Sequence, residues 1–322
     1  MTIEQHSALP AQAGGFTFTG KQQGLWTQAF QRLRRNRLAL AAGVVLVVIA
    51  GAAVAADALD AFQRHNPGLQ DYGAIEQGPS ASHWLGTDAL GRDLWSRLLQ
   101  ATLFSLKIGI GAQLVILVIG ITVGMLAALG GKFMDQLLMW FTDLAFAFPD
   151  LLAIVLMRQV LFGRDWPIIG TANPQIPGVG NVLLVTILAI SLVAWVTVAR
   201  LVRGQMLSIR EQDYVTAARC VGASPWRIVR AHMLPNTLGV IIVTSTFGVP
   251  AAIFAEAALS FIGLGVPPPD SSLGSLIASG QDRIQTHQIE LWLPAIMVAL
   301  LMLCFTFLGD GLRDALDPRT RK

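Results

Sequence analysis

The stretch Gln212–Asn236, QDYVTAARCVGASPWRIVRAHMLPN, lies between two long apolar runs and decides how the chain is organised. It is too polar to cross a bilayer, and helix start and stop signals divide it into two short helices. The first is predicted at about Asp213–Val221. It carries the adjacent small residues Ala217 and Ala218 and ends at Gly222, a residue suited to a left-handed helix terminus.

The second short helix is predicted to begin with Ser224 as its N-cap and Pro225 at its first helical position, the favoured arrangement at a helix start. It is expected to end near Leu234-Pro235, where the next apolar run begins. Two helices with a small-residue surface and a basic flank are suited to docking against another protein. The alternative is an ordinary cytosolic loop that contains two helices.

Composition places this stretch in a membrane protein. The chain has 322 residues, of which 53% are hydrophobic and only 13% charged, whereas about a quarter of the residues of a soluble domain are charged. Each membrane-spanning helix needs roughly 20 residues. Six apolar runs are long enough: 38–56, 103–129, about 134–161, about 182–202, about 237–264 and 291–308. We therefore expect an all-α integral membrane protein.

The distribution of Lys and Arg predicts the orientation, because cytoplasmic segments carry more of them. With the amino terminus inside, most of the 23 basic residues fall on the cytoplasmic side. Both termini and the Gln212–Asn236 loop are then cytoplasmic. The first run could instead be a cleavable signal peptide, since Ala53-Val54-Ala55 offers a cleavage pattern. Its 19 apolar residues exceed a signal core of about 7–15, so we expect an uncleaved helix.

Several side chains inside or beside the apolar runs need an explanation. Asp143 and Glu256 are ionisable and costly in a membrane, so we expect them to border the translocation route or its outer gate, or to be paired structurally. Pro149 is expected to kink its helix. Gly120, Gly124 and Ala128 form a small-residue face that packs either within the chain or against a partner.

The outer segment contains two acidic residues beside a glycine, Asp88 and Asp93. Their spacing matches no calcium loop. Arg92 and Arg97 lie alongside, so internal ion pairing and turn formation are expected instead. The two cysteines, Cys220 and Cys304, predict no disulfide framework.

The polar stretch also resembles a known family. Ala217-Ala218, then Gly222, then His232-x-Leu234-Pro235 is similar to the EAA loop of binding-protein-dependent ABC importer permeases, with Thr216 where that motif has Glu. In that family the loop forms a coupling helix seated in a cleft of the ATPase subunit. The coupling residues implied by the resemblance are Tyr214, Ala217, Ala218, Gly222, Ala223, Leu234 and Pro235.

Other stretches resemble the dipeptide and oligopeptide branch of this family, and its "C"-type subunit in particular. They are Leu85–Asp88 with Gly91–Asp93, Gly130–Asp135, Phe148-Pro149, and Ala255–Gly265. The sequence departs from the pattern in its longer outer loop Phe162–Asn181 and at Leu273. The resemblance implies the type I ABC importer permease fold and import of di- or oligopeptides. Nickel chelates, glutathione or another small solute remain alternatives.

The apolar runs, the distribution of basic residues and the resemblance together divide the chain into five parts. The expected parts are a cytoplasmic tail with an interfacial amphipathic helix (1–37), a first transmembrane helix (38–56), a periplasmic or extracellular segment (57–102), a five-helix permease core with a cytoplasmic coupling loop at 203–236 (103–309), and a second cytoplasmic tail (310–322). The expected location is the cytoplasmic (inner) membrane of a bacterium or archaeon.

No catalytic or nucleotide-binding signature is present in the sequence: it has no phosphate-binding loop, no H-E-x-x-H and no nucleophile elbow. The chain is therefore expected to be non-catalytic and to bind no metal or cofactor, with ATP and Mg on partner subunits. The implied partners are a homologous second permease subunit, two ATP-binding subunits, an extracytoplasmic solute-binding protein and the lipid bilayer, but no nucleic acid. A secondary transporter and an intramembrane enzyme are the more distant alternatives.

Overall fold

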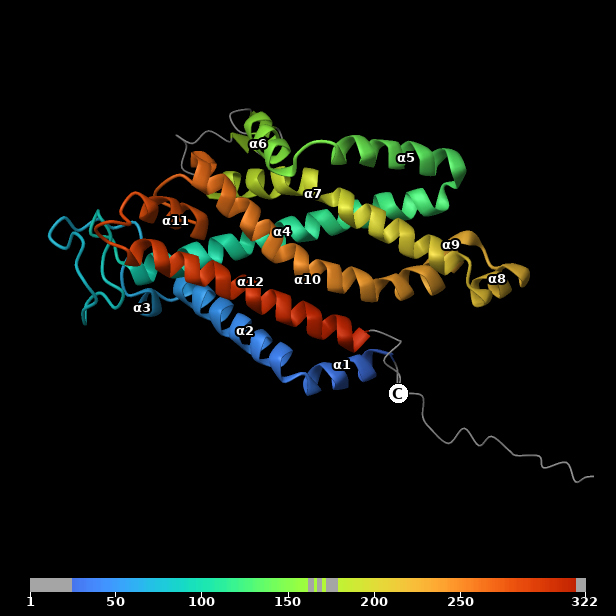
Figure 1. Cartoon of the computed structure of the whole chain (residues 1–322), viewed down its shortest axis with the longest axis horizontal. Helices are drawn as coiled ribbons and strands as arrows, with labels where there is room; N and C mark the ends of the chain where they lie inside the picture. Colours follow the sequence, from blue (N-terminus) through green and yellow to red (C-terminus); the bar gives the residue numbers. More distant parts are fainter. Residues whose placement is uncertain (1–24, 162–164, 167–169, 172–178, 317–322) are drawn as a thin grey trace, which may run out of the picture.

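The computed structural model describes residues 25–161, 165–166, 170–171 and 179–316, and it is an elongated helical bundle (Figure 1). The predictions for residues 1–20, and most of the loop 162–181, lie outside the described residues. The elements are α1 (Leu25–Arg35), α2 (Arg37–Ala58), α3 (Asp60–Gln63), α4 (Leu94–Leu129), α5 (Gly131–Phe146), α6 (Asp150–Leu161), the antiparallel pair β1 (Asp165–Trp166) and β2 (Gly170–Thr171), α7 (Val179–Arg210), α8 (Asp213–Cys220), α9 (Pro225–Ile228), the π-helix η1 (Val229–Met233), α10 (Leu234–Leu259), the π-helix η2 (Ser260–Leu264), α11 (Leu273–Gln281) and α12 (Ile289–Leu316).

The described residues contain five or six candidate membrane crossings. Five helical stretches are long and apolar enough to span a membrane: α2, α4, α7, the continuous run Pro225–Leu264, and α12. The helices α5 and α6 qualify as a sixth crossing only when they are taken together, and they are bent by 94° at the break between them. The predicted all-α membrane architecture is confirmed.

The third crossing is broken rather than merely kinked, which corrects the expectation of one helix over about 134–161. Proline lacks an N–H, clashes with the preceding helical turn, and disfavours helical geometry in the residue before it. Pro149 therefore ends α5 at Phe146, and its carbonyl accepts a hydrogen bond from the Ala153 N–H (2.9 Å) in the first turn of α6. The kink expected at Pro149 is confirmed, and the bend is large enough to separate the run into two helices.

The most extensive packing between two helices is that of α4 with α7, and small residues allow their close approach. A Cβ added at Gly120 would lie 2.7 Å from the Val198 Cβ, and one added at Gly124 would lie 2.5 Å from the Ala199 carbonyl oxygen. The small-residue face predicted on α4 therefore packs within the chain. Side chains of α4, α7 and α10 form the larger of the buried hydrophobic clusters.

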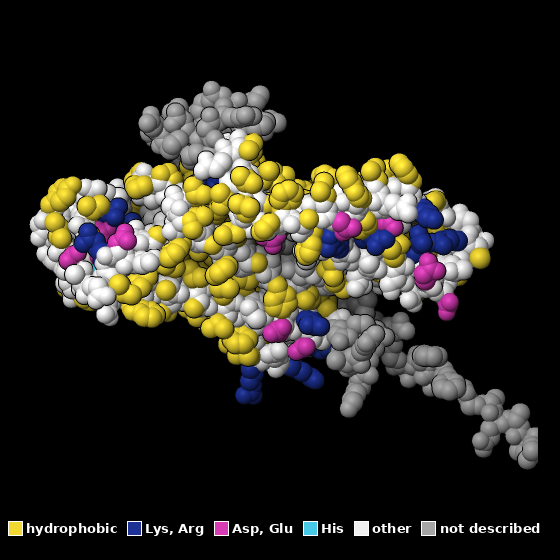
Figure 2. Space-filling model, turned by 45° about the horizontal axis from the view of Figure 1, so that its top comes forward, with side chains coloured by type: hydrophobic (Ala, Val, Ile, Leu, Met, Phe, Trp, Pro, Cys, Tyr) yellow, Lys and Arg dark blue, Asp and Glu magenta, His cyan; other side chains and the backbone are white. Residues whose placement is uncertain are grey.

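A second buried cluster joins α2, α4, α10, α11 and α12. At one end of the bundle α1 and α2 pack against α12, where a Cβ on Gly311 would clash with the Ala39 Cβ of α2 and would lie 3.3 Å from the Leu33 Cδ1 of α1. The ends that carry α1, the α4–α5 turn, α8–α9 and the last residues of α12 face the same way (Figure 1). Hydrophobic side chains cover much of the visible flank (Figure 2).

Several helix bounds differ from the expected ones. α4 begins at Leu94 instead of 103, because Asp93 caps it by accepting a hydrogen bond from the Ser96 N–H (2.9 Å). α7 runs on to Arg210, so the first residues of the expected coupling loop 203–236 belong to this helix. α12 continues to Leu316, and the short helix α11 was not predicted.

Candidate functional site

The polar stretch forms α8 and α9 at one end of the bundle, as predicted (Figure 1). The end of α8 has both hydrogen bonds of a Schellman cap. The Gly222 N–H donates to the Arg219 carbonyl (2.9 Å), and the Ala223 N–H donates to the Ala218 carbonyl (3.0 Å). Gly222 has φ +82°, so the left-handed terminus predicted there is confirmed. This geometry favours glycine because a Cβ is strained at positive φ.

The second helix starts as predicted but does not end near Leu234-Pro235. Ser224 caps it by accepting a hydrogen bond from the Arg227 N–H (3.4 Å). The helix then passes through one π turn, in which the Leu234 N–H donates to the Val229 carbonyl, and continues as α10. The wide turn precedes Pro235, where a normal turn would be disturbed by the missing N–H and the proline ring. The second short helix is thus continuous with α10.

The docking element, defined as residues 213–233, is anchored on one side by buried apolar residues. Val215 of α8, Ile228 at the end of α9, and Val229 and Met233 of η1 are all buried. They belong to the same hydrophobic cluster as residues of α4 and α7. Burying such side chains contributes roughly 1.5–3 kcal/mol each, so the element is fixed to the bundle.

Its other side exposes large apolar residues. Val221 is 85% exposed and Trp226 is 64% exposed, on either side of the Gly222 turn. Sequence reasoning did not single out either residue. The available signal was an apolar side chain immediately before the helix-ending glycine and another directly after the N-terminal proline.

The predicted coupling residues divide between the two sides. Tyr214, Ala217, Gly222 and Pro235 are exposed. The others pack partly against the buried cluster; they are Ala218, Ala223 and Leu234. Tyr214 also lies beside His232, with ring centroids 6.0 Å apart. The structure brings these residues together at the same end of the bundle, and their contact with an ATPase stays a prediction.

Asp143 lies on α5 next to α7 and is 71% exposed at its side chain. Arg200 of α7 donates to the Asp143 Oδ1 (2.8 Å), and its guanidinium also lies over the Phe146 ring at 4.4 Å. Nearer the α4–α5 turn, Arg203 makes a two-pronged contact with Asp135. Asp143 is therefore paired with a basic residue, as the structural alternative for this residue predicted.

Glu256 is buried and holds three elements together. Its carboxylate accepts hydrogen bonds from Ser105 of α4 (3.2 Å) and Ser260 of η2 (2.7 Å). Ser260 in turn lies 3.3 Å from the hydroxyl of Ser272, the N-cap of α11. This arrangement matches the structural pairing that was the alternative to a gate. Its role at a gate stays a prediction.

The segment of residues 59–93, called the outer segment for its predicted side of the membrane, is held by ionic contacts and turns around Asp88. The buried Asp88 carboxylate accepts hydrogen bonds from the N–H groups of Leu90 and Arg92 (2.9 Å each) and from the Arg92 Nε (2.8 Å), and it pairs with Arg97. The expected ion pairing and turn formation are confirmed. Cys220 and Cys304 are free thiols, as expected.

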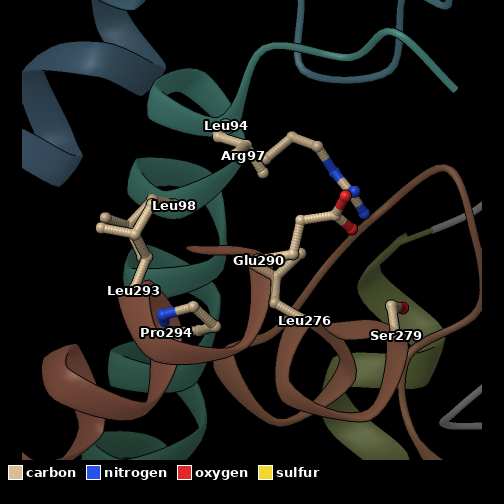
Figure 3. Close-up of a pocket in the computed structure, with 8 residues that line it drawn as sticks. All are labelled: Leu94, Arg97, Leu98, Leu276, Ser279, Glu290, Leu293 and Pro294. Atoms are coloured by element: carbon tan, nitrogen blue, oxygen red, sulfur yellow. The ribbon is translucent and has the colours of Figure 1, made fainter. Parts of the chain in front are cut away.

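A small cavity lies between the start of α4, α11 and the start of α12, where Arg97 and Glu290 point toward each other (Figure 3). Its volume of about 10 Å³ has room for about one water molecule. It is far too small for a peptide, so this cavity is not a solute-binding site.

Comparison with known proteins identifies the chain's relatives. The family of binding-protein-dependent transport system inner membrane components matches residues 120–322, and the N-terminal transmembrane domain of oligopeptide transport permease C matches residues 24–79. The chain is 35% identical to the oligopeptide transport system permease protein OppC of Bacillus subtilis, over 94% of this chain and 92% of that protein. It is 39% identical to the dipeptide permease DppC of the same organism, over 91% and 86%. It is 35% identical to the glutathione permease GsiD of Pectobacterium atrosepticum, over 92% of each.

A solved structure of the MetNI methionine ABC transporter in an inward-facing conformation has a chain of the same fold. The TM-score is 0.56 at 20% identity, over 70% of this chain and 97% of that chain. The relatives are membrane transport components rather than enzymes, in agreement with the expected non-catalytic role. The chain belongs to the family of inner membrane components of binding-protein-dependent transport systems, the permease subunits of ABC importers.

Proposed function

We propose that this permease imports di- or oligopeptides and is driven by separate ATPase subunits through the docking element. The observation that carries the coupling role is the exposed apolar pair Val221 and Trp226 on a firmly anchored turn. Exposed apolar residues at the end of a helical bundle favour contact with another protein. A nucleotide-binding subunit is the partner that the family membership supports.

The anchor explains how motion would pass into the membrane. Val215 and Ile228 lie in the same buried cluster as Val198 and Val202 of α7, and η1 leads without a break into α10. Packed interiors deform little. A displacement of the docking element therefore moves α7 and α10 instead of being absorbed in a loop.

The remaining parts of the proposal concern what each end of the helical bundle faces. The docking element faces the cytoplasm together with both termini, which is supported by the basic residues of α1, α8 and α9. ATP and Mg bind to two partner subunits and not to this chain. A solute-binding protein delivers cargo to the opposite face, which carries the outer segment and α11.

A second permease subunit would form the other side of the pathway, opposite the exposed face of α5. In α5 only Thr142 is buried, and Trp140, Phe141 and Asp143 are exposed. An acidic side chain facing lipid at mid-membrane costs roughly 2.5–3.5 kcal/mol. The Asp143–Arg200 pair is therefore better placed against an aqueous pathway or a partner than against lipid.

Reconstitution of the complete transporter tests the coupling role. In proteoliposomes that contain the partner permease, the ATPases and the binding protein, Trp226→Glu and Val221→Asp should leave the complex inserted but lower substrate-stimulated ATP hydrolysis more than tenfold. Trp226→Phe, which keeps an apolar ring, should retain most of it. Normal stimulation in both acidic variants, with normal assembly, would refute the docking role.

The substrate is proposed from the relatives. OppC and DppC support a peptide cargo, and GsiD supports glutathione as a second candidate. Uptake of a labelled dipeptide and of labelled glutathione should be compared in the same vesicles with the cognate binding protein. Faster dipeptide uptake that unlabelled glutathione fails to inhibit is the expected result, and the reverse pattern would reassign the cargo.

A further inference from the structure

Two histidines and an aspartate meet where the outer segment closes against the start of α4. The His83 Nδ1 lies 2.9 Å from the Asp93 Oδ1, and the His65 Nδ1 lies 4.0 Å from the same oxygen. The two imidazole rings are 4.6 Å apart between centroids. One donor atom from each residue lies within 4.8 Å of the other two.

The hydrogen bonds of this cluster leave one atom unexplained. The Asp93 Oδ2 accepts from the Ser96 N–H (2.9 Å) and the Ser96 hydroxyl (2.7 Å), which fixes the carboxylate and directs Oδ1 toward the histidines. The His83 Nδ1 has the Asp93 Oδ1 as its hydrogen-bond partner. The His65 Nδ1 is buried and makes no hydrogen bond in the described part of the chain. A buried polar atom without a partner is costly.

We propose that His65, His83 and Asp93 bind one divalent transition-metal ion of the zinc class, through His65 Nδ1, His83 Nδ1 and Asp93 Oδ1. Two imidazoles and a carboxylate suit Zn²⁺, and a water molecule would complete four-coordination. Tetrahedral ligands at zinc distances are about 3.3 Å apart. The observed separations bracket that value, so small side-chain movements complete the site.

The surroundings support a metal ion at this position. Asp93 is the acidic member of the cluster. The hydrogen bonds from Ser96 fix the orientation of its carboxylate, as hydrogen bonds to a metal-binding carboxylate commonly do. The nearby Arg92 and Arg97 are paired with Asp88, and the Arg64 guanidinium is turned onto the Trp84 ring at 4.3 Å. The side chain of His65 is 36% exposed, which leaves an access route from the outer face.

A bound ion would fasten the outer segment to the membrane domain. The three ligands come from the residues just after α3, from the middle of the outer segment, and from the N-cap of α4. A metal that joins them closes two loops, of 18 and 10 residues, onto the end of one spanning helix. The ion would be structural, and this inference does not depend on the proposed ATPase coupling or cargo.

The competing explanation is a His83–Asp93 hydrogen bond with His65 merely nearby. The two explanations differ at His65, so His65→Ala is the informative substitution. Asp93→Asn is less useful because Asp93 also caps α4. His287→Ala, a histidine on the same outer face, serves as the matched control, and Cys220→Ser removes an exposed thiol that could bind zinc adventitiously.

The experiment is zinc titration of the purified full-length chain within its complex in lipid nanodiscs, in the Cys220→Ser background. Calorimetry should show one Zn²⁺ per chain, X-ray absorption should show nitrogen and oxygen ligands, and Mg²⁺ should not compete. His65→Ala should weaken the affinity by more than about tenfold, and His287→Ala should not change it.

Thermal unfolding gives a second reading of the same site. Zn²⁺ should raise the unfolding temperature of the parent protein and of His287→Ala but not that of His65→Ala. The proposal is overturned if the parent binds no stoichiometric Zn²⁺, or if His65→Ala binds it as tightly as the parent does.

Discussion

Asp143 of α5 and Arg200 of α7 form an ion pair in which the Arg200 Nη2 lies 2.8 Å from the Asp143 Oδ1. Together with the two-pronged contact of Arg203 with Asp135, this ion pair holds α5 alongside α7. Because only Thr142 of α5 is buried, these charges are a large part of what positions this helix. In the third crossing, α5 is thus held to α7 by ion pairs and by the stacking of Phe141 on Trp195, whereas α6 is anchored by the buried residues Ile154 and Leu161.

Removing the charge of Asp143 should affect transport more than stability. The carboxylate is mostly exposed, and an exposed pair contributes only about 0–1 kcal/mol. We expect Asp143→Asn to leave the unfolding temperature nearly unchanged and to lower uptake in reconstituted vesicles severalfold. The charge-exchanged double variant Asp143→Arg with Arg200→Asp is the control and should recover part of the lost uptake. Unchanged uptake in Asp143→Asn would remove this residue from the pathway.

Substitution of Gly222 should uncouple the transporter without preventing insertion. At φ +82° a side chain costs roughly 1–2 kcal/mol, and more for a β-branched one. A Cβ at Gly222 would meet nothing within 4 Å, so the strain acts on the turn itself. Gly222→Val should therefore reduce substrate-stimulated ATP hydrolysis.

Gly131 provides the matched control for this variant. It also has positive φ (+77°) with open space around it, but it lies in the α4–α5 turn. Gly131→Val should carry a similar strain and retain more of the stimulation. Normal stimulation in Gly222→Val, at normal expression, would count against the docking element as the coupling site.

Filling the α4–α7 contact should destabilise the bundle. A Cβ at Gly124 would lie 2.5 Å from the Ala199 carbonyl oxygen, and a backbone atom has little freedom to move. We expect Gly124→Ala to cost about 1–3 kcal/mol, measured as a lower unfolding temperature. Gly51→Ala in α2, where a Cβ meets nothing within 4 Å, should be neutral or stabilising. Equal unfolding temperatures for the two variants would contradict the tight packing.

Two substitutions of Glu256 can distinguish a structural role from a gating role for this residue. Glu256→Gln keeps an oxygen that can accept from Ser105 or Ser260, whereas Glu256→Ala leaves buried hydroxyls without this acceptor. An unsatisfied buried polar group costs about 1–3 kcal/mol. We expect near-normal stability and uptake for the glutamine variant and a clear loss of stability for alanine. A glutamine variant that is stable but inactive in uptake would favour the gate instead.

Local signals in the sequence were sufficient for the architecture and for the docking element. The apolar runs predicted the crossings, and Gly222, Ser224 and Pro225 predicted the helix boundaries because their backbone requirements are intrinsic. The break at Pro149 was underestimated, since its size depends on how α6 packs against α7. The exposure of Val221 and Trp226 could not be predicted, because exposure is a property of the assembled bundle.

The continuous passage from η1 into α10 and the identity of the partner of Asp143 could not be predicted for the same reason. Pro235 suggests a helix end when only its own residue is considered, yet a π turn lets the helix continue past it. Asp143 and Arg200 are 57 residues apart in sequence. Only the antiparallel packing of α5 on α7 brings them together.

The length of α4 has a consequence for communication across the membrane. Its 36 residues correspond to a rod about 54 Å long, which exceeds the roughly 30 Å hydrocarbon layer. One end is capped by Asp93 within the outer segment, and near the other end the Arg210 side chain of α7 reaches the Ala128 carbonyl (3.4 Å). A displacement at the Asp93 end can therefore be carried to the α4–α5 turn through one continuous helix, with no flexible loop between the two ends.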